Sequence, residues 1–114
     1  MYDLLQEMNS MKAELHRSMK MLRKNGEEMA QAENDYQTIK AKEWVLMEGA
    51  GCPTTKIKET IKGQPRVAEA LLKRDLAQIM YEANQEHINV VKLELRVIEN
   101  QIAREWSNGA TQNV

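Results

Sequence analysis

No glycine or proline occurs between Arg66 and Ser107, and apolar side chains recur through this stretch at intervals of three and four residues. The stretch is rich in Ala, Leu, Glu, Lys and Arg, which favour the α-helix. Pro65 suits the first helical position, and Gly109 lies where a left-handed residue can stop a helix. The sequence therefore predicts one long amphipathic helix over residues 65–106, roughly 60 Å in length.

Two apolar stripes follow the second half of this helix. One is a heptad seam and the other lies beside it. The seam is Ile88, Val91, Leu95, Ile98 and Ile102, and the second stripe is Val90, Leu93 and Val97. Farther upstream, the apolar residues at steps of four, three and four are Leu72, Leu76, Ile79 and Ala83. Such a face is too wide for a single partner helix, so it must pack against the N-terminal half, another chain or both.

This excess of apolar surface predicts an oligomer, most simply a two-fold dimer. Large exposed apolar patches are rare on soluble monomers, and a symmetric copy can cover the same stripe on both chains. The candidate oligomer interface is Ile88, Val90, Val91, Leu93, Leu95, Val97, Ile98, Ile102 and Trp106.

The first 48 residues also follow a heptad pattern. Fourteen positions from Met1 to Leu46 alternate by three and four, and eleven of them carry Leu, Ile, Met, Ala or Tyr, which predicts a helix over about residues 2–48. The pair Asn25-Gly26 is a strong turn signal, so the sequence leaves open a continuous, kinked or split helix at residues 25–26.

Residues 49–64 form the predicted corner between the two helices. We expect Thr54 or Thr55 to cap a short helix through Ile61, and Gly63 to stop it with a positive φ. The long helices should then run antiparallel, with residue n opposite about residue 114 − n, which places Trp106 near Met8 as a packing residue. The predicted fold is all-α: an elongated, coiled-coil-like antiparallel helical hairpin forming a single domain over residues 1–109, with a disordered tail at 110–114.

The formal net charge is −1, so no overall charge attracts nucleic acid or an anionic membrane. The one cysteine, Cys52, excludes an intramolecular disulfide. Because no signal peptide and no long apolar run is present, we expect a cytoplasmic protein without a membrane partner. Two clusters of basic residues are candidate contacts to an acidic partner or to phosphate, although a solvated surface is the simpler explanation. These residues are Lys20, Arg23, Lys24, Lys56, Lys58, Lys62 and Arg66.

No catalytic constellation stands out. His16 and His87 belong to no metal-ligand spacing, the glycines form no phosphate-binding loop, and no serine lies in a nucleophile elbow. We therefore expect no catalytic, cofactor-binding or metal-binding residue, and no enzyme. Seven of the eight methionines lie in residues 1–47, which is typical either of an imperfect core or of an adaptable binding face.

Three stretches of the chain resemble those of a known family. They are residues 30–42 (AQAENDYQTIKAK), Gly51-Cys52-Pro53 with Gly63 following, and Arg74-Asp75 leading to residues 87–96 and 101–106. Together they resemble small, essentially uncharacterised helical proteins of phages and prophages of Gram-positive bacteria, over about residues 20–106. The resemblance implies a phage-derived accessory protein in the cytoplasm of a bacterial host, and it transfers no functional residue.

Three functions are compatible with these observations. The first is a non-enzymatic accessory protein that binds and modulates another protein, such as a host, defence or DNA-processing factor, through a helical surface. The second is a nucleic-acid-binding protein of phage replication or recombination, in which the short helix and the start of the next one mimic a helix-turn-helix. The third is a scaffold or chaperone of assembly.

Overall fold

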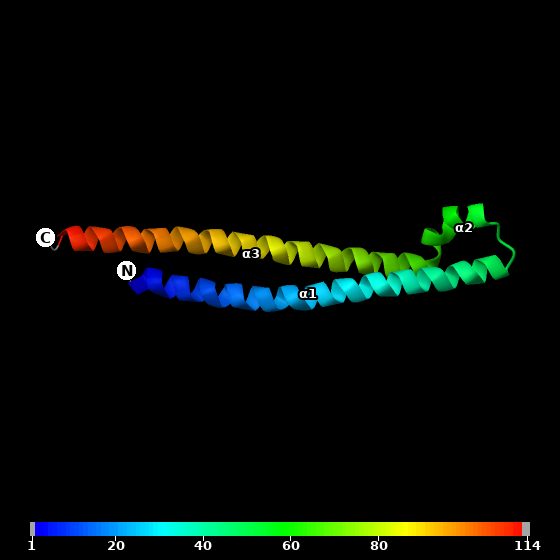
Figure 1. Cartoon of the computed structure of the whole chain (residues 1–114), viewed down its shortest axis with the longest axis horizontal. Helices are drawn as coiled ribbons and strands as arrows, with labels where there is room; N and C mark the ends of the chain where they lie inside the picture. The colour runs from blue at the N-terminus through cyan, green and yellow to red at the C-terminus, as the bar shows by residue number, and fades with distance from the viewer. Residues whose placement is uncertain (1, 113–114) are drawn as a thin grey trace. The chain divides into compact units, whose positions relative to one another are not determined.

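The computed structural model describes the backbone of residues 2–112 and the side chains of residues 2–109. Its elements in chain order are α1 (Tyr2–Gly49), α2 (Thr54–Thr60), the short 3₁₀ helix η1 (Ile61–Gly63) and α3 (Pro65–Gln112) (Figure 1). Residues 2–112 contain no strand, so the expected all-α class with two long helices is confirmed. The chain forms two compact units. The terminal unit comprises Met1–Arg23 with Ala83–Val114, and the corner unit comprises Lys24–Glu82.

Helix α1 runs for 48 residues without a break, so the turn signal at Asn25-Gly26 does not split it. Gly26 has a packing reason to be glycine. A Cβ added there would lie 3.3 Å from Cε2 of Tyr81 on α3. Glycine inside a helix costs about 1 kcal/mol relative to alanine, and at this position it allows the Tyr81 ring to lie directly against α1.

The heptad positions expected in the first half form the less exposed side of α1. In the terminal unit the buried or half-buried members are Leu4, Met8, Met11, Leu15, Ser18 and Leu22. In the corner unit they are Asn25, Met29, Ala32, Tyr36, Ile39 and Glu43. The last expected position departs from the pattern, because Leu46 is 62% exposed and Met47 takes the inner place.

The end of α1 lies where the sequence predicts it, and Gly51 determines its geometry. Gly51 has a φ of 83°. Its N–H donates to the carbonyl of Glu48, and the N–H of Cys52 donates to the carbonyl of Met47, each at 3.0 Å. These two bonds are a Schellman motif. The motif brings Cys52 against the same apolar cluster that Met47 contacts, so Cys52 is a packing residue of the corner.

Helix α2 begins at Thr54 without a side-chain cap. Pro53 is its N-cap residue and makes no side-chain cap hydrogen bond, so the expectation that Thr54 or Thr55 caps this helix is wrong. The N–H of Ile57 donates instead to the carbonyl of Pro53 at 3.0 Å. Pro53 serves in this position because its φ of −61° and ψ of 145° already present the carbonyl to the first turn.

The expectation that Gly63 has a positive φ is also wrong, since Gly51 is the one glycine with a positive φ among the described residues. The chain leaves η1 through Gln64, which is extended at φ −65° and ψ 135°. The carbonyl of Gln64 then accepts a 2.8 Å bond from the N–H of Ala68, which makes Pro65 the first residue of α3, as predicted. The short helix therefore ends at an extended residue, Gln64, and not at a left-handed glycine.

The corner unit is a helical hairpin whose core lies at the corner itself. Its buried cluster consists of Tyr36, Ile57, Ile61, Val67 and Ala70. Partly buried side chains from the end of α1 and from the turn surround it, namely Ile39, Trp44, Met47, Cys52 and Leu71. Ile57 and Val67 are completely buried. Because α2 and η1 supply two of the five buried residues, the short helix is a structural part of the core.

Helix α3 turns one side inward along its length. In the corner unit the inner residues are Val67, Ala70, Arg74, Ala77 and Tyr81. In the terminal unit they are Asn84, Ile88, Val91, Leu95, Ile98 and Ile102. The expected seam from Ile88 to Ile102 is therefore the inner side of α3. The upstream apolar residues are not inner residues, because Leu72, Leu76 and Ile79 are all more than half exposed.

In the terminal unit α1 and α3 run antiparallel in a register that differs from the expected one. Glu14 lies 2.9 Å from His87, and Asn84 contacts the carbonyl of Ser18, whereas the expected register places Glu14 opposite Asn100. With the observed pairing, the last turns of α3 extend past the first turn of α1 (Figure 1). No described residue of α1 lies opposite those turns (Figure 1).

This overhang explains two differences from expectation. Trp106 is 76% exposed, so the prediction that it packs near Met8 is wrong. Helix α3 also continues to Gln112, past its expected end at residue 106, and Gly109 lies within it. A helix can accommodate one glycine at a cost of about 1 kcal/mol, so Gly109 does not have to stop it. Of the tail expected to be disordered, residues 110–112 are helical and residues 113–114 lie outside the described part of the chain.

Candidate interaction surfaces

Helix α3 exposes a row of large apolar side chains that we call the outer stripe. In the corner unit its members are Leu72 (59% exposed), Leu76 (52%) and Ile79 (59%). In the terminal unit they are Val90 (43%), Leu93 (59%) and Val97 (56%). Side chains of this kind on a helix are normally turned toward a core, so the outer stripe is the most unusual surface of the chain.

The outer stripe is exposed because the inner residues of α3 occupy the opposite side of the helix. Leu93 lies two positions from the inner residues Val91 and Leu95. Two positions on an α-helix correspond to a rotation of about 200°. In the corner unit Leu72 lies two positions from Ala70 and Arg74 in the same way. One helix packed on the inner side therefore leaves the outer stripe in water.

The nine residues of the expected interface fall into three groups. Three are buried inside the terminal unit, namely Ile88 (6% exposed), Val91 (4%) and Ile98 (4%). Leu95 and Ile102 are half-buried beside them. Val90, Leu93, Val97 and Trp106 are the exposed members. The packing of α1 thus uses the seam, and it leaves the second stripe available to another molecule.

A polar cluster crosses between the two helices of the terminal unit. Glu14 contacts Nε2 of His87 at 2.9 Å and pairs with Arg17 on its own helix. Ser18 is buried, its hydroxyl donates to Glu14 at 3.4 Å, and its carbonyl accepts a 3.1 Å bond from the side-chain amide of Asn84. Every atom in this cluster that is buried has a partner. The cluster sets the register of the two helices, because a shift by one turn breaks both cross-helix contacts.

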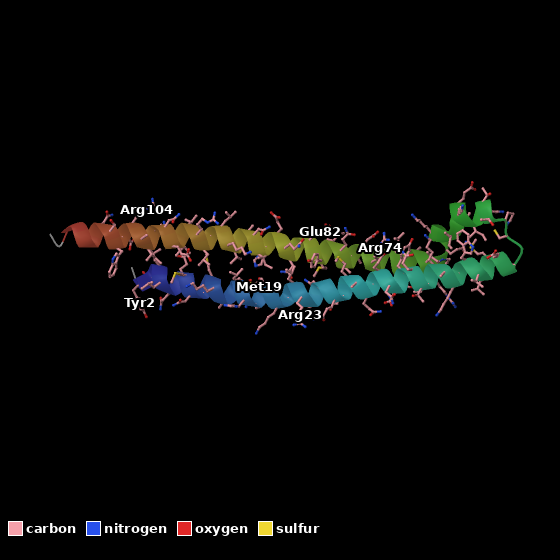
Figure 2. The ribbon with its side chains drawn as sticks, in the orientation of Figure 1. Tyr2, Met19, Arg23, Arg74, Glu82 and Arg104 are labelled. Atoms are coloured by element: carbon pink, nitrogen blue, oxygen red, sulfur yellow. The ribbon has the colours of Figure 1, made fainter. Side chains whose placement is uncertain are left out.

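In the corner unit Arg74 has the corresponding role. Its guanidinium lies 4.6 Å from the centre of the Tyr36 ring on α1. It also pairs with Glu33 of α1 at 3.5 Å and with the neighbouring Asp75 at 3.2 Å. The side chain of Arg74 is 30% exposed, so the guanidinium over the ring is only partly removed from water. Arg74, labelled on α3 in Figure 2, therefore joins the two helices where an aliphatic residue would be expected.

A groove of about 560 Å³ lies between α1 and the first turns of α3 in the corner unit. Its apolar floor comes from Ala32, Ile39 and Ala70. The charged residues along it are Glu28, Asp35, Lys42, Arg66, Glu69 and Lys73. The two signs of charge are balanced, so the groove does not favour a strongly anionic or a strongly cationic ligand.

The side chains of the expected basic contacts are all exposed. Lys20 and Arg23 belong to the terminal unit, and Lys24 begins the corner unit. Lys56 and Lys58 lie on α2, and Lys62 lies in η1. Arg66 lies in the first turn of α3 and lines the groove.

The described residues contain no group of three or more His, Cys, Asp or Glu side chains that could hold a metal ion. Cys52 is a free thiol, half-buried at the corner. His87 is engaged with Glu14, and the pair is partly exposed.

Sequence reasoning missed Arg74, Asn84 and Tyr81 as inner residues of α3. The signal that could have found them is the heptad phase of the inner seam, continued upstream from Ile88. Counting back from Ile88 by four, three, four and three gives Asn84, Tyr81, Ala77 and Arg74, although two of the four side chains are polar or charged. The same count shows that Leu72, Leu76 and Ile79 continue the phase of Val90, and not that of Ile88.

Neither long helix contains a segment apolar enough to cross a membrane, as far as its described residues extend. The chain was also compared with known proteins. No family model, no curated protein and no solved structure matches it.

Proposed function

We propose that this protein is a non-enzymatic accessory protein that binds and modulates another protein through its helical surface. The observation that carries the proposal is the outer stripe: six large aliphatic side chains on α3 are 43–59% exposed although the opposite side of the same helix is packed. Exposed apolar rows of this kind mark protein-binding helices, which dock through residues spaced by three and four.

The resemblance to small phage and prophage proteins supports a cytoplasmic setting in a bacterial host. A host, defence or DNA-processing factor is the class of partner that this setting offers. Exposed methionines add adaptable apolar surface, since Met19 and Met21 in the terminal unit are 53% and 47% exposed.

Affinity capture from a lysate of a Gram-positive host tests this function. The bait is the parent chain, and the matched control is the Leu93→Glu, Val97→Glu variant, which changes two exposed residues and leaves the inner seam intact. We expect a host protein that the parent retains and the control loses. Identical captured proteins for parent and control would contradict a role for the outer stripe, and no specific capture by either would contradict the function.

Nucleic-acid binding is a second candidate, supported by the exposed lysines of α2 and η1. Lys56, Lys58 and Lys62 lie within seven residues of one another in a short helical segment, with Glu59 as the acidic residue between them. Binding through phosphate contacts falls steeply with salt. Retention of duplex DNA at low salt that a Lys56→Gln, Lys58→Gln, Lys62→Gln variant abolishes would favour this candidate. No retention by the parent at low salt would exclude it.

A further inference from the structure

The residues of the outer stripe are spaced like the seam of a coiled coil. They occupy heptad positions, with Leu72, Leu76 and Ile79 in the corner unit and Val90, Leu93 and Val97 in the terminal unit. We propose that the stripe is covered by a second copy of this chain, with α3 packed antiparallel on α3 about a two-fold axis. The inference rests on the proposed function, because both treat the stripe as a binding surface, and it names the first occupant of that surface.

The apolar residues are arranged so that an antiparallel copy pairs them completely. Leu72 meets the partner's Val97, Leu76 meets the partner's Leu93, and Ile79 meets the partner's Val90. The two-fold axis repeats each pair. Every member of the outer stripe thereby gains an apolar neighbour at its own level, and each half of the stripe covers the other half of the partner copy. A C₂ interface of this kind is self-complementary.

The charged residues beside the stripe favour the same alignment. On one flank, Lys73 comes opposite the partner's Glu94. On the other flank, Asp75 comes opposite the partner's Arg96. All four side chains are exposed in the single chain, and the axis doubles both pairs. Flanking charges are the residues that set partner choice and orientation when helices pair through a heptad seam. Four complementary pairs in one register are the specific argument for this occupant.

The parallel, in-register arrangement lacks these features. It places Glu86 opposite the partner's Glu86 within the seam, which separates the two halves of the stripe with like charges. It also brings Lys73, Asp75, Glu94 and Arg96 opposite neutral side chains. In the antiparallel arrangement Glu86 lies opposite the partner's Ala83, a small residue beside which a carboxylate can reach water. The charge pattern therefore distinguishes the two orientations.

Charge reversal with rescue tests the register. Lys73→Glu and Glu94→Lys each place like charges in two symmetric positions, and each should raise the dimer dissociation constant about tenfold or more. The double variant Lys73→Glu, Glu94→Lys restores opposite charges and should return the constant to within about threefold of the parent value. Matched controls are Lys92→Glu and Glu99→Lys, which make the same charge changes at exposed positions away from the stripe. The constants are measured by sedimentation equilibrium.

A cross-linking experiment tests the orientation independently. In a Cys52→Ala background, chains carrying Leu76→Cys are mixed with chains carrying Leu93→Cys and treated with a short bis-maleimide. The antiparallel dimer should cross-link the mixture efficiently. Leu93→Cys alone should fail to cross-link, because its two copies are about 25 Å apart along the helix. Leu76 and Leu93 are both exposed, and helicity measured by circular dichroism checks that each variant, including the Cys52→Ala background, folds.

Three results would overturn the proposal: a monomeric parent, charge-reversal rescue that does not occur, or cross-linking of Leu93→Cys with itself in preference to the mixture. They differ from the results that would contradict the proposed function. A monomeric parent whose outer-stripe variants lose a captured host protein rejects the second copy as occupant and retains the interaction function. A monomeric parent whose outer-stripe variants capture the same proteins as the parent rejects the second copy and any role of the outer stripe, whereas no specific capture by parent or variant rejects the interaction function.

Discussion

Replacing Arg74 tests whether the contact between α1 and α3 in the corner unit depends on a cation over an aromatic ring. Arg74→Met keeps an unbranched apolar stem over Tyr36 and removes the charge. In the parent the guanidinium is 4.6 Å from the ring centre, and its side chain is 30% exposed. A cation–π contact of this partly exposed kind contributes about 0.5–1 kcal/mol.

The ion pairs of Arg74 add less to this magnitude. Glu33 and Asp75 are 48% and 51% exposed, so each pair is screened by solvent and contributes at most a few tenths of a kcal/mol. We therefore expect Arg74→Met to lower the free energy of unfolding by about 1 kcal/mol, and Arg74→Ala by about 2 kcal/mol because it also removes the stem.

The assay is urea unfolding followed by far-UV circular dichroism at one fixed protein concentration, because association would shift the midpoint. A double-mutant cycle with Tyr36→Leu isolates the pair. We expect a coupling energy of about 0.5–1 kcal/mol between the two substitutions. Effects that add within about 0.3 kcal/mol would refute the reasoning, and Arg74 would then act only as a spacer.

The remaining predictions concern single residues, and the same unfolding assay checks them. Gly51→Ala should cost about 1–2 kcal/mol, because φ at this position is 83°, whereas Gly63→Ala should leave stability unchanged or slightly higher; equal costs at both sites would contradict this account of the corner. The free energy of unfolding of Gly26→Ala should lie within about 0.5 kcal/mol of the parent value, since better helix propensity offsets the close contact of a Cβ 3.3 Å from Tyr81. The bulkier Gly26→Val should cost about 1–3 kcal/mol. Trp106→Ala should change stability by less than about 0.5 kcal/mol because the side chain is 76% exposed, and a loss of several kcal/mol would mean that something covers it.

Much of this fold could be predicted from heptad spacing, because spacing reports which residues share a helix face. The long helices, the corner and the inner seam from Ile88 to Ile102 follow from it. The register of α1 and α3 in the corner unit, where Arg74 lies against Tyr36 and Glu33, does not, since it depends on how α2 and η1 pack there. The prediction assumed that α3 begins level with the end of α1. In the structure α2 and η1 cover that end of α1 with Ile57 and Ile61.

The upstream half of α3 shows a second limit of apolar pattern. Leu72, Leu76 and Ile79 have the stronger hydrophobic signal, yet Arg74 and Tyr81 occupy the inner side. Arg74 can do so because its stem is apolar and its guanidinium makes a cation–π contact with the Tyr36 ring. Apolar pattern alone cannot recognise such a pair, because the two residues are far apart in the sequence. The outer stripe is the consequence: apolar character alone places Leu72, Leu76 and Ile79 on the inner side, and only the heptad count back from Ile88 assigns them to the outer one.

The central claim is that α3 uses two opposite faces, one for α1 and one for a second chain. Sedimentation equilibrium of the Leu93→Glu variant beside the parent tests it most directly, because Leu93 is 59% exposed and its neighbours Val91 and Leu95 remain intact. The account predicts a parent of twice the 13.2 kDa chain mass and a variant that is a 13.2 kDa monomer with unchanged helicity. A parent and a variant of the same mass, or a variant that loses its helical structure on becoming monomeric, would contradict it.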